Sequence, residues 1–275
     1  MKTWNLLCAA SLIGAAAVLA GTAGASTAST SPQLTAATNA YRAWVVSETA
    51  KLALGVRQLS AALDAGNLAR ARSLYGPVHA HYEQIEPVAE SFGNLDPEID
   101  ARANDVPASK WRGFHRIEQL LFQKNTTAGT PALGKQLVTD VETLAAKEKT
   151  MKLTAAELAN GSDDLLDEIA SSKITGEEER YSHTDLADFQ ANLAGAREAF
   201  VLLSPALTKT GNAALVTTIR SRFAAVQTGL NKYKRATPLG FALYGALTPT
   251  DRRTLSGQVD ALAEPMSTIA SKLGA

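Results

Sequence analysis

Residues 41–63 read YRAWVVSETAKLALGVRQLSAAL, and their pattern decides the fold class. Apolar side chains recur here every three or four residues, which is the spacing of one face of an α-helix. The apolar stripe consists of Tyr41, Val45, Leu52, Val56, Leu59 and Leu63. Helical periodicity also dominates the rest of the chain, and no stretch shows the sustained two-residue alternation of a strand. The sequence therefore predicts an all-α protein.

The same periodicity predicts a series of helices separated by loops with glycine, asparagine or proline. The expected helices span residues 34–64, 67–91, 109–124, 132–160, 162–172, 177–209, 211–235 and 249–273. Short loops make consecutive helices antiparallel neighbours, so we expect a helix bundle. Pro87 is expected to distort the second helix locally, because proline cannot donate a helical hydrogen bond.

Composition narrows the class of protein further. Hydrophobic residues make up 45% of the 275 residues, which is ample for a packed core, and aromatic residues make up only 6%. The chain has 27 basic and 27 acidic side chains and so carries no net charge. A dedicated nucleic-acid-binding protein would be clearly basic, so we expect no nucleic-acid partner.

The first residues have the pattern of a secretory signal. Lys2 precedes an apolar run at residues 6–20, and small residues lead to an expected cleavage site after Ala25. The run is too short to span a bilayer, and it contains Cys8, the only cysteine. We therefore expect a soluble, exported protein without disulfides. The expected division is a signal peptide at residues 1–25, a flexible leader at 26–33 and one helical domain at 34–275.

Several carboxylates fall on helix faces that should be buried. Glu48 lies inside the apolar stripe of the first helix. In the segment 111–122, Glu118 lies in the middle of the apolar stripe and His115 lies one turn earlier at its edge. An unpaired buried charge costs several kcal/mol, so these side chains need partners.

The second helix and the loop after it are also acidic. His79, Glu83, Glu86 and Glu90 run along one border of the apolar face of that helix, where like charges repel unless a cation compensates them. The non-periodic stretch 93–109 follows, and it carries Asp96, Glu98, Asp100 and Asp105. Long loops in compact helical domains are often functional.

These residues indicate a metal site. If Glu48, Glu83, Glu86, His115 and Glu118 converge between helices, they form an oxygen-rich set with one imidazole, which suits iron, manganese, calcium or, less specifically, zinc. Metal-binding bundles place Glu and His three residues apart, and His115 and Glu118 have that spacing in reverse order.

The same residues also have interpretations that involve no metal. Glu48 and Glu118 can pair with arginines such as Arg112 or Arg116, residues 79–90 can be a solvated face, and Glu178 can close a capping box with Thr175.

Four segments together resemble the imelysin-like proteins, and within them the periplasmic component of EfeUOB-type iron-uptake systems. They are YRAWVVSETAKL (41–52), YEQIEPVAESFGNLDPEIDAR (82–102), GFHRIE (113–118) and ITGEEERYSHTDLADFQAN (174–192). The GxHxxE motif at Gly113, His115 and Glu118 is the signature of this family, and the resemblance covers nearly all of residues 34–273.

The resemblance implies two four-helix bundles and a periplasmic metal-binding protein with its site around the HxxE motif. Carried over residue by residue, the candidate ligands are His115, Glu118, Glu48, Glu83, Glu86, Asp96 and Glu178. Iron is the metal that the resemblance favours, with zinc, copper, calcium and manganese also open. The implied partners are an inner-membrane iron permease and a periplasmic peroxidase-like protein. Many family members carry an N-terminal cupredoxin-like domain, which we expect this chain to lack, so any oxidation step would need a partner.

Two other functions compete with iron binding. The family includes a periplasmic alginate-binding protein. Basic side chains that could bind an acidic polysaccharide are present in this chain, although they could equally form an ordinary solvated helix surface. They are Arg57, Arg70, Arg72, Lys232, Lys234, Arg235, Arg252 and Arg253. Imelysin has also been classed among peptidases, but the chain has no HExxH motif for a two-histidine zinc platform. We therefore expect a non-enzymatic, exported metal-binding protein.

Overall fold

The computed structural model describes residues 31–274, which form helices and loops without a β-strand. The predicted signal peptide and residues 26–30 of the predicted leader lie outside this range. The long helices are α1 (Pro32–Asp64), α2 (Leu68–Ile85), α5 (Thr130–Glu148), α6 (Ala155–Ser171), α7 (Asp185–Lys209), α8 (Ala213–Asn231) and α9 (Pro249–Met266). Short elements are the 3₁₀ helices Glu86–Phe92, Lys173–Thr175 and Tyr244–Ala246, the π-helical turn Gln119–Gln123, and α3 (Leu95–Asp100), α4 (Phe114–Glu118) and α10 (Ile269–Leu273).

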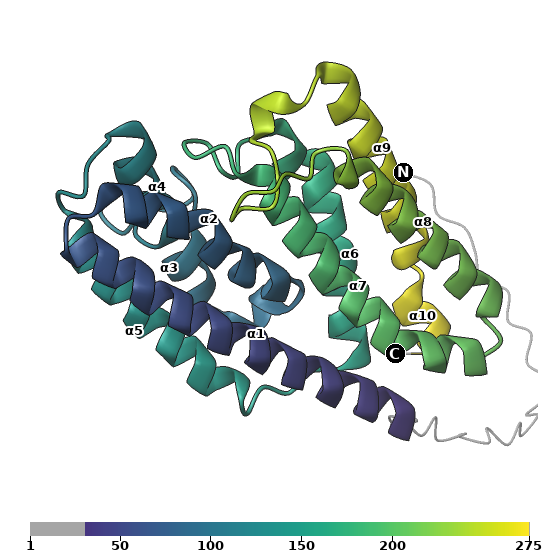
Figure 1. The fold of residues 1–275 in the computed structure, drawn as a ribbon. Coiled ribbons are helices and arrows are strands. Elements are labelled where there is room, and N and C mark those ends of the chain that lie inside the picture. Colours follow the sequence, from purple (N-terminus) through teal and green to yellow (C-terminus); the bar gives the residue numbers. More distant parts are fainter. Residues whose placement is uncertain (1–30, 275) are drawn as a thin grey trace, which may run out of the picture.

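Within this range the helices pack into two bundles (Figure 1). In the first bundle, on the left of the figure, α1 packs against α2 and α5, and the short helices α3 and α4 complete the group. The second bundle consists of α6, α7, α8 and α9, with α10 against α6 and α7. Helix α2 packs against α7 and joins the two bundles. The expectation of an all-α, two-bundle protein is confirmed.

The distortion expected at Pro87 is present. Helix α2 ends at Ile85, and residues Glu86–Phe92 continue as a 3₁₀ helix. Proline cannot donate a backbone hydrogen bond and its ring crowds the preceding turn, so the α-helical pattern stops just before it. Glu83 near the end of α2 and Glu86 at the start of the 3₁₀ helix both contact Lys173 and Asn192.

One predicted helix boundary is wrong. The sequence pattern placed a break at Gly161, but the structure has its break at residues 149–154, and α6 runs through Gly161. Thr154 begins α6 with a capping box: its hydroxyl accepts the Glu157 amide at 3.1 Å, and the Glu157 carboxylate accepts the Thr154 amide at 2.7 Å. Gly161 serves close packing, since a Cβ there would lie 2.1 Å from the carbonyl oxygen of Pro87.

The Gly161→Ala variant is expected to lower the free energy of unfolding by about 2 kcal/mol or more, because backbone must move to admit the methyl group. Gly257→Ala is the matched control in α9, where an added Cβ meets nothing within 4 Å. That control is expected to raise stability by about 0.5–1 kcal/mol, since alanine is the better helix former. Urea unfolding measures both, and equal shifts of the two variants would contradict the packing role of Gly161.

Two further predicted boundaries also differ from the structure. Helix α7 begins at Asp185 rather than at residue 177, so residues 176–184 form a loop. Glu178 therefore closes no capping box with Thr175, and its side chain pairs with Arg102. The acidic stretch 93–109 contains α3, and the helix expected at 109–124 is reduced to α4 and the π-helical turn. Both differences lie where side chains from separate helices converge on one polar cluster.

A buried carboxyl group on α5 makes stability depend on pH. Glu148 is 1% exposed, and one of its oxygens accepts a hydrogen bond of 2.7 Å from the Thr49 hydroxyl. Burial raises its pKa from 4.5 to about 8, although the Thr49 hydrogen bond opposes this change. Between these values the folded chain holds a proton that the unfolded chain releases, so stability falls as the pH rises through this range.

Replacement of Glu148 with glutamine removes this dependence. Glu148→Gln is expected to match the wild type near pH 4.5 and to exceed its free energy of unfolding by at least about 1 kcal/mol at pH 8, since one pKa unit is worth about 1.4 kcal/mol. Urea unfolding at the two pH values measures the effect. The same difference at both pH values would show that folding does not raise the pKa of Glu148.

Candidate metal centre

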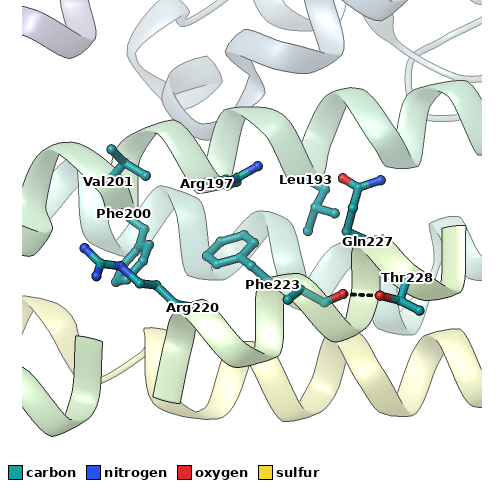
Figure 2. A pocket seen from close by; sticks show the side chains of 9 residues that line it. Leu193, Arg197, Phe200, Val201, Arg220, Phe223, Gln227 and Thr228 are labelled. Carbon is teal, nitrogen blue, oxygen red and sulfur yellow. Dashed lines mark hydrogen bonds between the residues drawn. The ribbon is translucent and has the colours of Figure 1, made fainter. Parts of the chain in front are cut away.

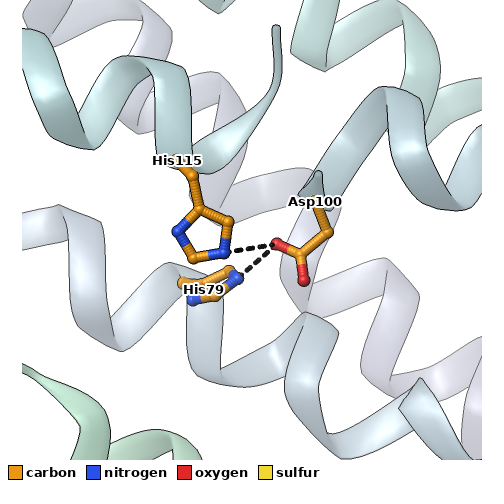
Figure 3. A group of neighbouring side chains, drawn as sticks. All are labelled: His79, Asp100 and His115. Carbon is orange, nitrogen blue, oxygen red and sulfur yellow. Dashed lines mark hydrogen bonds and ion pairs between the residues drawn. The ribbon is translucent and has the colours of Figure 1, made fainter. Parts of the chain in front are cut away.

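Two histidines and an aspartate meet where α2, α3 and α4 converge (Figure 3). Asp100 Oδ1 lies 2.6 Å from His79 Nε2 and 3.6 Å from His115 Nε2. Both imidazoles are buried, and the Asp100 side chain is 9% exposed. Burial alone lowers the pKa of each histidine, but the nearby Asp100 carboxylate and other acids raise both pKa values well above 6.5.

More carboxylates surround the two imidazoles. Glu83 Oε1 lies 3.3 Å from His79 Nε2, and Glu178 Oε1 lies 3.4 Å from His115 Nε2. On its other side, His79 Nδ1 lies 2.7 Å from Glu179 Oε1 and 3.8 Å from Asp188 Oδ1. We call this set the histidine–carboxylate cluster; it consists of His79, Glu83, Asp100, His115, Glu178, Glu179 and Asp188.

The cluster contains buried polar atoms whose hydrogen bonding is incomplete within residues 31–274. They are His79 Nδ1, Glu83 Oε1, His115 Nε2 and both carboxylate oxygens of Asp188. Leaving such an atom buried without a partner costs about 1–3 kcal/mol, and more for a charged group. Nitrogen and carboxylate donors that face one another and lack partners are the surroundings that a metal ion requires. The residues present therefore fit a metal ion.

Gly113 makes this convergence possible. Its φ is +82°, and a Cβ at this position would lie 2.1 Å from the carbonyl oxygen of Ile99. The backbone before α4 therefore passes directly against the end of α3, which brings His115 next to Asp100. Only glycine tolerates both the conformation and the contact. This contact explains the glycine of the GxHxxE motif.

Glu118 holds His115 and the loop 176–184 in place. Glu118 Oε1 accepts hydrogen bonds of 2.7 Å from the backbone amides of Tyr181 and Ser182, and Oε2 lies 3.3 Å from His115 Nδ1. Burial by itself raises the pKa of Glu118, but hydrogen bonds from His115 and the two amides lower it below its usual value. A carboxylate bonded in this way fixes the imidazole with Nε2 toward Asp100.

Two basic side chains balance part of the negative charge. Lys173 Nζ is fully buried and lies 2.9 Å from Glu83 Oε2 and 2.8 Å from Glu86 Oε2. Arg102 Nη1 lies 2.9 Å from Glu178 Oε2. Burial alone lowers the pKa of Lys173, but the surrounding glutamates raise it well above 10.5, so the ammonium is charged.

The structure brings some of the predicted ligands together and separates others. His115, Glu83 and Glu178 belong to the cluster, and Glu118 supports it through His115. Glu86 contacts Lys173, and Asp96 Oδ1 accepts a 2.6 Å hydrogen bond from Tyr82.

Glu48 lies apart from the cluster. It is 5% exposed, as its place on the apolar stripe predicts, but it pairs with Lys51 at 2.6 Å and His81 at 3.0 Å. Arg112 and Arg116, the alternative partners that the sequence suggests, are not among the ion pairs of Glu48 in the described part of the chain.

Sequence reasoning missed other members of the cluster. The sequence pattern places His79 on a helix border and Asp100 in an acidic stretch, but neither is among the predicted ligands. Glu179 and Asp188 were not noted as candidates. One available signal was the four-residue spacing of His79 and Glu83, which places both on one helix face. Glu179 carried no comparable signal, because the loop that positions it was expected to be helical.

An acidic cleft of about 250 Å³ leads from the surface to the cluster. Its lining includes Glu86, Asp96, Asp100, Arg102, Glu168 and Glu178. A larger cavity of about 440 Å³ lies between α7 and α8 and is lined by Phe200, Phe223, Arg197 and Arg220, with no histidine or carboxylate (Figure 2). Of these two cavities, the acidic cleft is the one suited to a cation.

Comparison with known proteins identifies the family of this chain. The family model Peptidase M75, described as imelysin, matches residues 37–269. The chain belongs to the imelysin family. It is also 42% identical over 242 residues to the proteins named iron uptake system component EfeO from Escherichia coli (strain K12) and Shigella flexneri. These alignments cover 86% of this chain and 64% of each relative, so the chain spans less than two-thirds of their length.

The described part of this imelysin-family chain has no helix long and apolar enough to cross a membrane. Its GxHxxE residues have distinct positions: Gly113 permits the approach of α3, His115 faces the cluster, and Glu118 binds the loop 176–184. The family signature thus marks the meeting point of α3, α4 and that loop.

Proposed function

We propose that this chain is a periplasmic binding protein that holds one iron ion as cargo in the histidine–carboxylate cluster. The observation that carries the proposal is the approach of His79 Nε2, His115 Nε2 and Asp100, with His115 Nε2 left without a hydrogen-bond acceptor in the described residues. The names of the EfeO relatives support iron as the cargo.

The proposed ligands are His79, His115 and Asp100, with Glu83 and Glu178 completing the set. The facing atoms of His79 and Glu83, of His115 and Asp100, and of His115 and Glu178 are separated by 3.3–3.6 Å, and His79 and Asp100 are closer at 2.6 Å. Two ligand atoms that are each about 2.1 Å from one ion lie about 3.0–3.4 Å apart, so small side-chain movements suffice. Two histidines and one carboxylate form a donor set that suits ferrous iron. Zinc, copper, manganese and calcium are competitors, because such donors discriminate weakly between ions.

The geometry of Glu118 argues against a peptidase in which the glutamate of the GxHxxE motif is the general base. A metallopeptidase needs a carboxylate that is free to take a proton from a metal-bound water. Glu118 has one oxygen committed to two backbone amides and the other directed at His115, so it is poorly placed for this task. We propose that the cargo passes to an inner-membrane permease, with a peroxidase-like protein supplying any oxidation step.

The alternative function, alginate binding, stays a prediction from the family resemblance. It expects retention on alginate that weakens with salt, and no retention on a neutral glucan. Equal retention of both polymers would exclude specific alginate binding.

Calorimetric titration of metal-stripped protein tests the proposed function. Ferrous ion under anaerobic conditions, ferric ion as a soluble chelate, and zinc ion are the ligands. The wild type is expected to bind one ferrous ion with micromolar affinity or better, and the His115→Ala/Glu118→Ala variant is expected to lose this binding. Glu48→Gln serves as the control, because Glu48 is also a buried glutamate but lies outside the cluster. Unchanged iron affinity in the double variant, or a loss in the Glu48→Gln control, would overturn the assignment.

A further inference from the structure

A lysine ammonium occupies a position within the carboxylates that resembles the site of a bound cation. Lys173 Nζ lies 2.9 Å from Glu83 Oε2, 2.8 and 2.9 Å from the two oxygens of Glu86, and 3.7 Å from Glu178 Oε1. The lysine side chain is fully buried. Burying an ammonium group is costly unless opposite charges and hydrogen bonds surround it, and here carboxylates from separate elements do so.

The carboxylates around Lys173 are held in place by a further contact. Asn192 Nδ2 on α7 lies 2.8 Å from Glu83 Oε2 and 2.6 Å from Glu86 Oε2, the same oxygens that face the ammonium. The ammonium and the three glutamate oxygens nearest to it are therefore all hydrogen-bonded without a metal ion, whereas Asn192 Oδ1 has no partner in the described residues. This part of the cluster differs from the imidazole side, where His115 Nε2 and Glu83 Oε1 have no hydrogen-bond partner in the described residues.

Glu83 and Glu178 each lie between a histidine and Lys173. Glu83 directs Oε2 at Lys173 and Oε1 at His79, and Glu178 Oε1 lies between His115 at 3.4 Å and Lys173 at 3.7 Å. The cluster thus offers two adjoining positions for positive charge, one beside the imidazoles and one beside Glu86. The second already contains the lysine ammonium.

We propose that Lys173 is a tethered cation that fills the second of these positions, so that the cluster binds a single metal ion on its imidazole side. This inference rests on the proposed function. It assigns Glu86 to the lysine rather than to the metal, although Glu86 borders the acidic cleft through which an ion enters. Removing the ammonium then converts Glu83, Glu86 and Glu178 into a second metal position.

The number of metal ions bound per chain tests the inference. Ferrous and manganous ions are titrated calorimetrically into the metal-stripped wild type and the Lys173→Met variant, and the metal retained after desalting is measured by mass spectrometry. One ion is expected for the wild type and two for Lys173→Met, whose side chain is neutral and similar in length. Lys209→Met, an exposed position on α7, is the control and is expected to bind one ion.

The outcomes separate this inference from the proposed function. A wild type that binds no ion overturns the proposed function and, with it, the role of Lys173. One ion in the wild type and one ion in Lys173→Met, at whatever affinity, overturns only the inference. Two ions in the wild type overturn the inference and also the single-ion stoichiometry of the proposed function.

A second variant keeps the lysine in place, because Lys173→Met leaves buried glutamates facing one another without a cation. Glu86→Gln is expected to change the wild-type iron affinity by less than threefold, since Glu86 contacts Lys173 and not the imidazoles. Circular dichroism checks that it folds. A loss of affinity of tenfold or more in this variant would make Glu86 a metal ligand and overturn the inference.

Discussion

Replacing Asp100 with asparagine is expected to weaken iron binding at least a hundredfold, which corresponds to about 2.7 kcal/mol. Asp100 Oδ1 lies 2.6 Å from His79 Nε2 and 3.6 Å from His115 Nε2, so it is the carboxylate that both imidazoles share. Asparagine keeps the size of the side chain but removes the negative charge that would neutralise the ion. Calorimetric titration of the metal-stripped variant measures the loss.

Asp105→Asn is the matched control for this experiment. Asp105 lines the same acidic cleft, but its side chain is 45% exposed and pairs with Arg102. Its replacement removes one unit of negative charge from the cleft without touching either histidine, and less than a threefold change in affinity is expected. If the two variants lose affinity equally, the general negative potential of the cleft holds the ion, and Asp100 is not a specific ligand.

Replacing Glu118 with alanine is expected to lower the free energy of unfolding by about 3–5 kcal/mol, the usual consequence of removing one partner of a buried ion pair. The change leaves the amides of Tyr181 and Ser182 without their acceptor and His115 without its Nδ1 partner. Iron affinity is also expected to fall by about 10- to 100-fold, because the imidazole is no longer oriented. Urea unfolding of the metal-free protein and calorimetry measure the two effects.

The Glu118→Gln variant distinguishes two roles for Glu118, the orientation of His115 and direct binding of the metal ion. Its amide oxygen still accepts from both backbone amides, so it is expected to keep more stability and more iron affinity than Glu118→Ala. Glu177→Ala, an exposed change in the same loop, is the control and is expected to alter neither quantity appreciably. Glu118 would be a metal ligand, contrary to this account, if Glu118→Gln bound iron as weakly as Asp100→Asn.

Helical phase succeeded in predicting which polar side chains are buried. Glu48 and Glu118 were both expected on apolar faces, and they are 5% and 0% exposed. Helical phase does not identify which residue of the neighbouring helix such a buried side chain contacts. Glu48 on α1 meets His81, and His81 lies two residues from His79 on α2, which places the two imidazoles on nearly opposite sides of that helix. The predicted convergence of Glu48 with Glu83 fails for this reason.

Asp100 and Lys173 show a different limit of prediction. Asp100 lies in a stretch without helical periodicity, and its position depends on Gly113 passing against Ile99, which no local pattern reveals. Lys173 is a residue type that is almost never buried unless it is paired. Its partners Glu83 and Glu86 lie about 90 positions away in sequence, so the network exists only when the two bundles are together. The prediction of the HxxE region needed only local spacing and the family resemblance.

Crystals of the protein soaked with ferrous ion under anaerobic conditions, measured on both sides of the iron absorption edge, test the central claim most directly. The expected result is one anomalous peak per chain, within bonding distance of His79 Nε2, His115 Nε2 and Asp100, with Lys173 still between Glu83 and Glu86. A peak bound by other residues, or no peak at this cluster in crystals of a protein that binds iron in solution, would contradict the account.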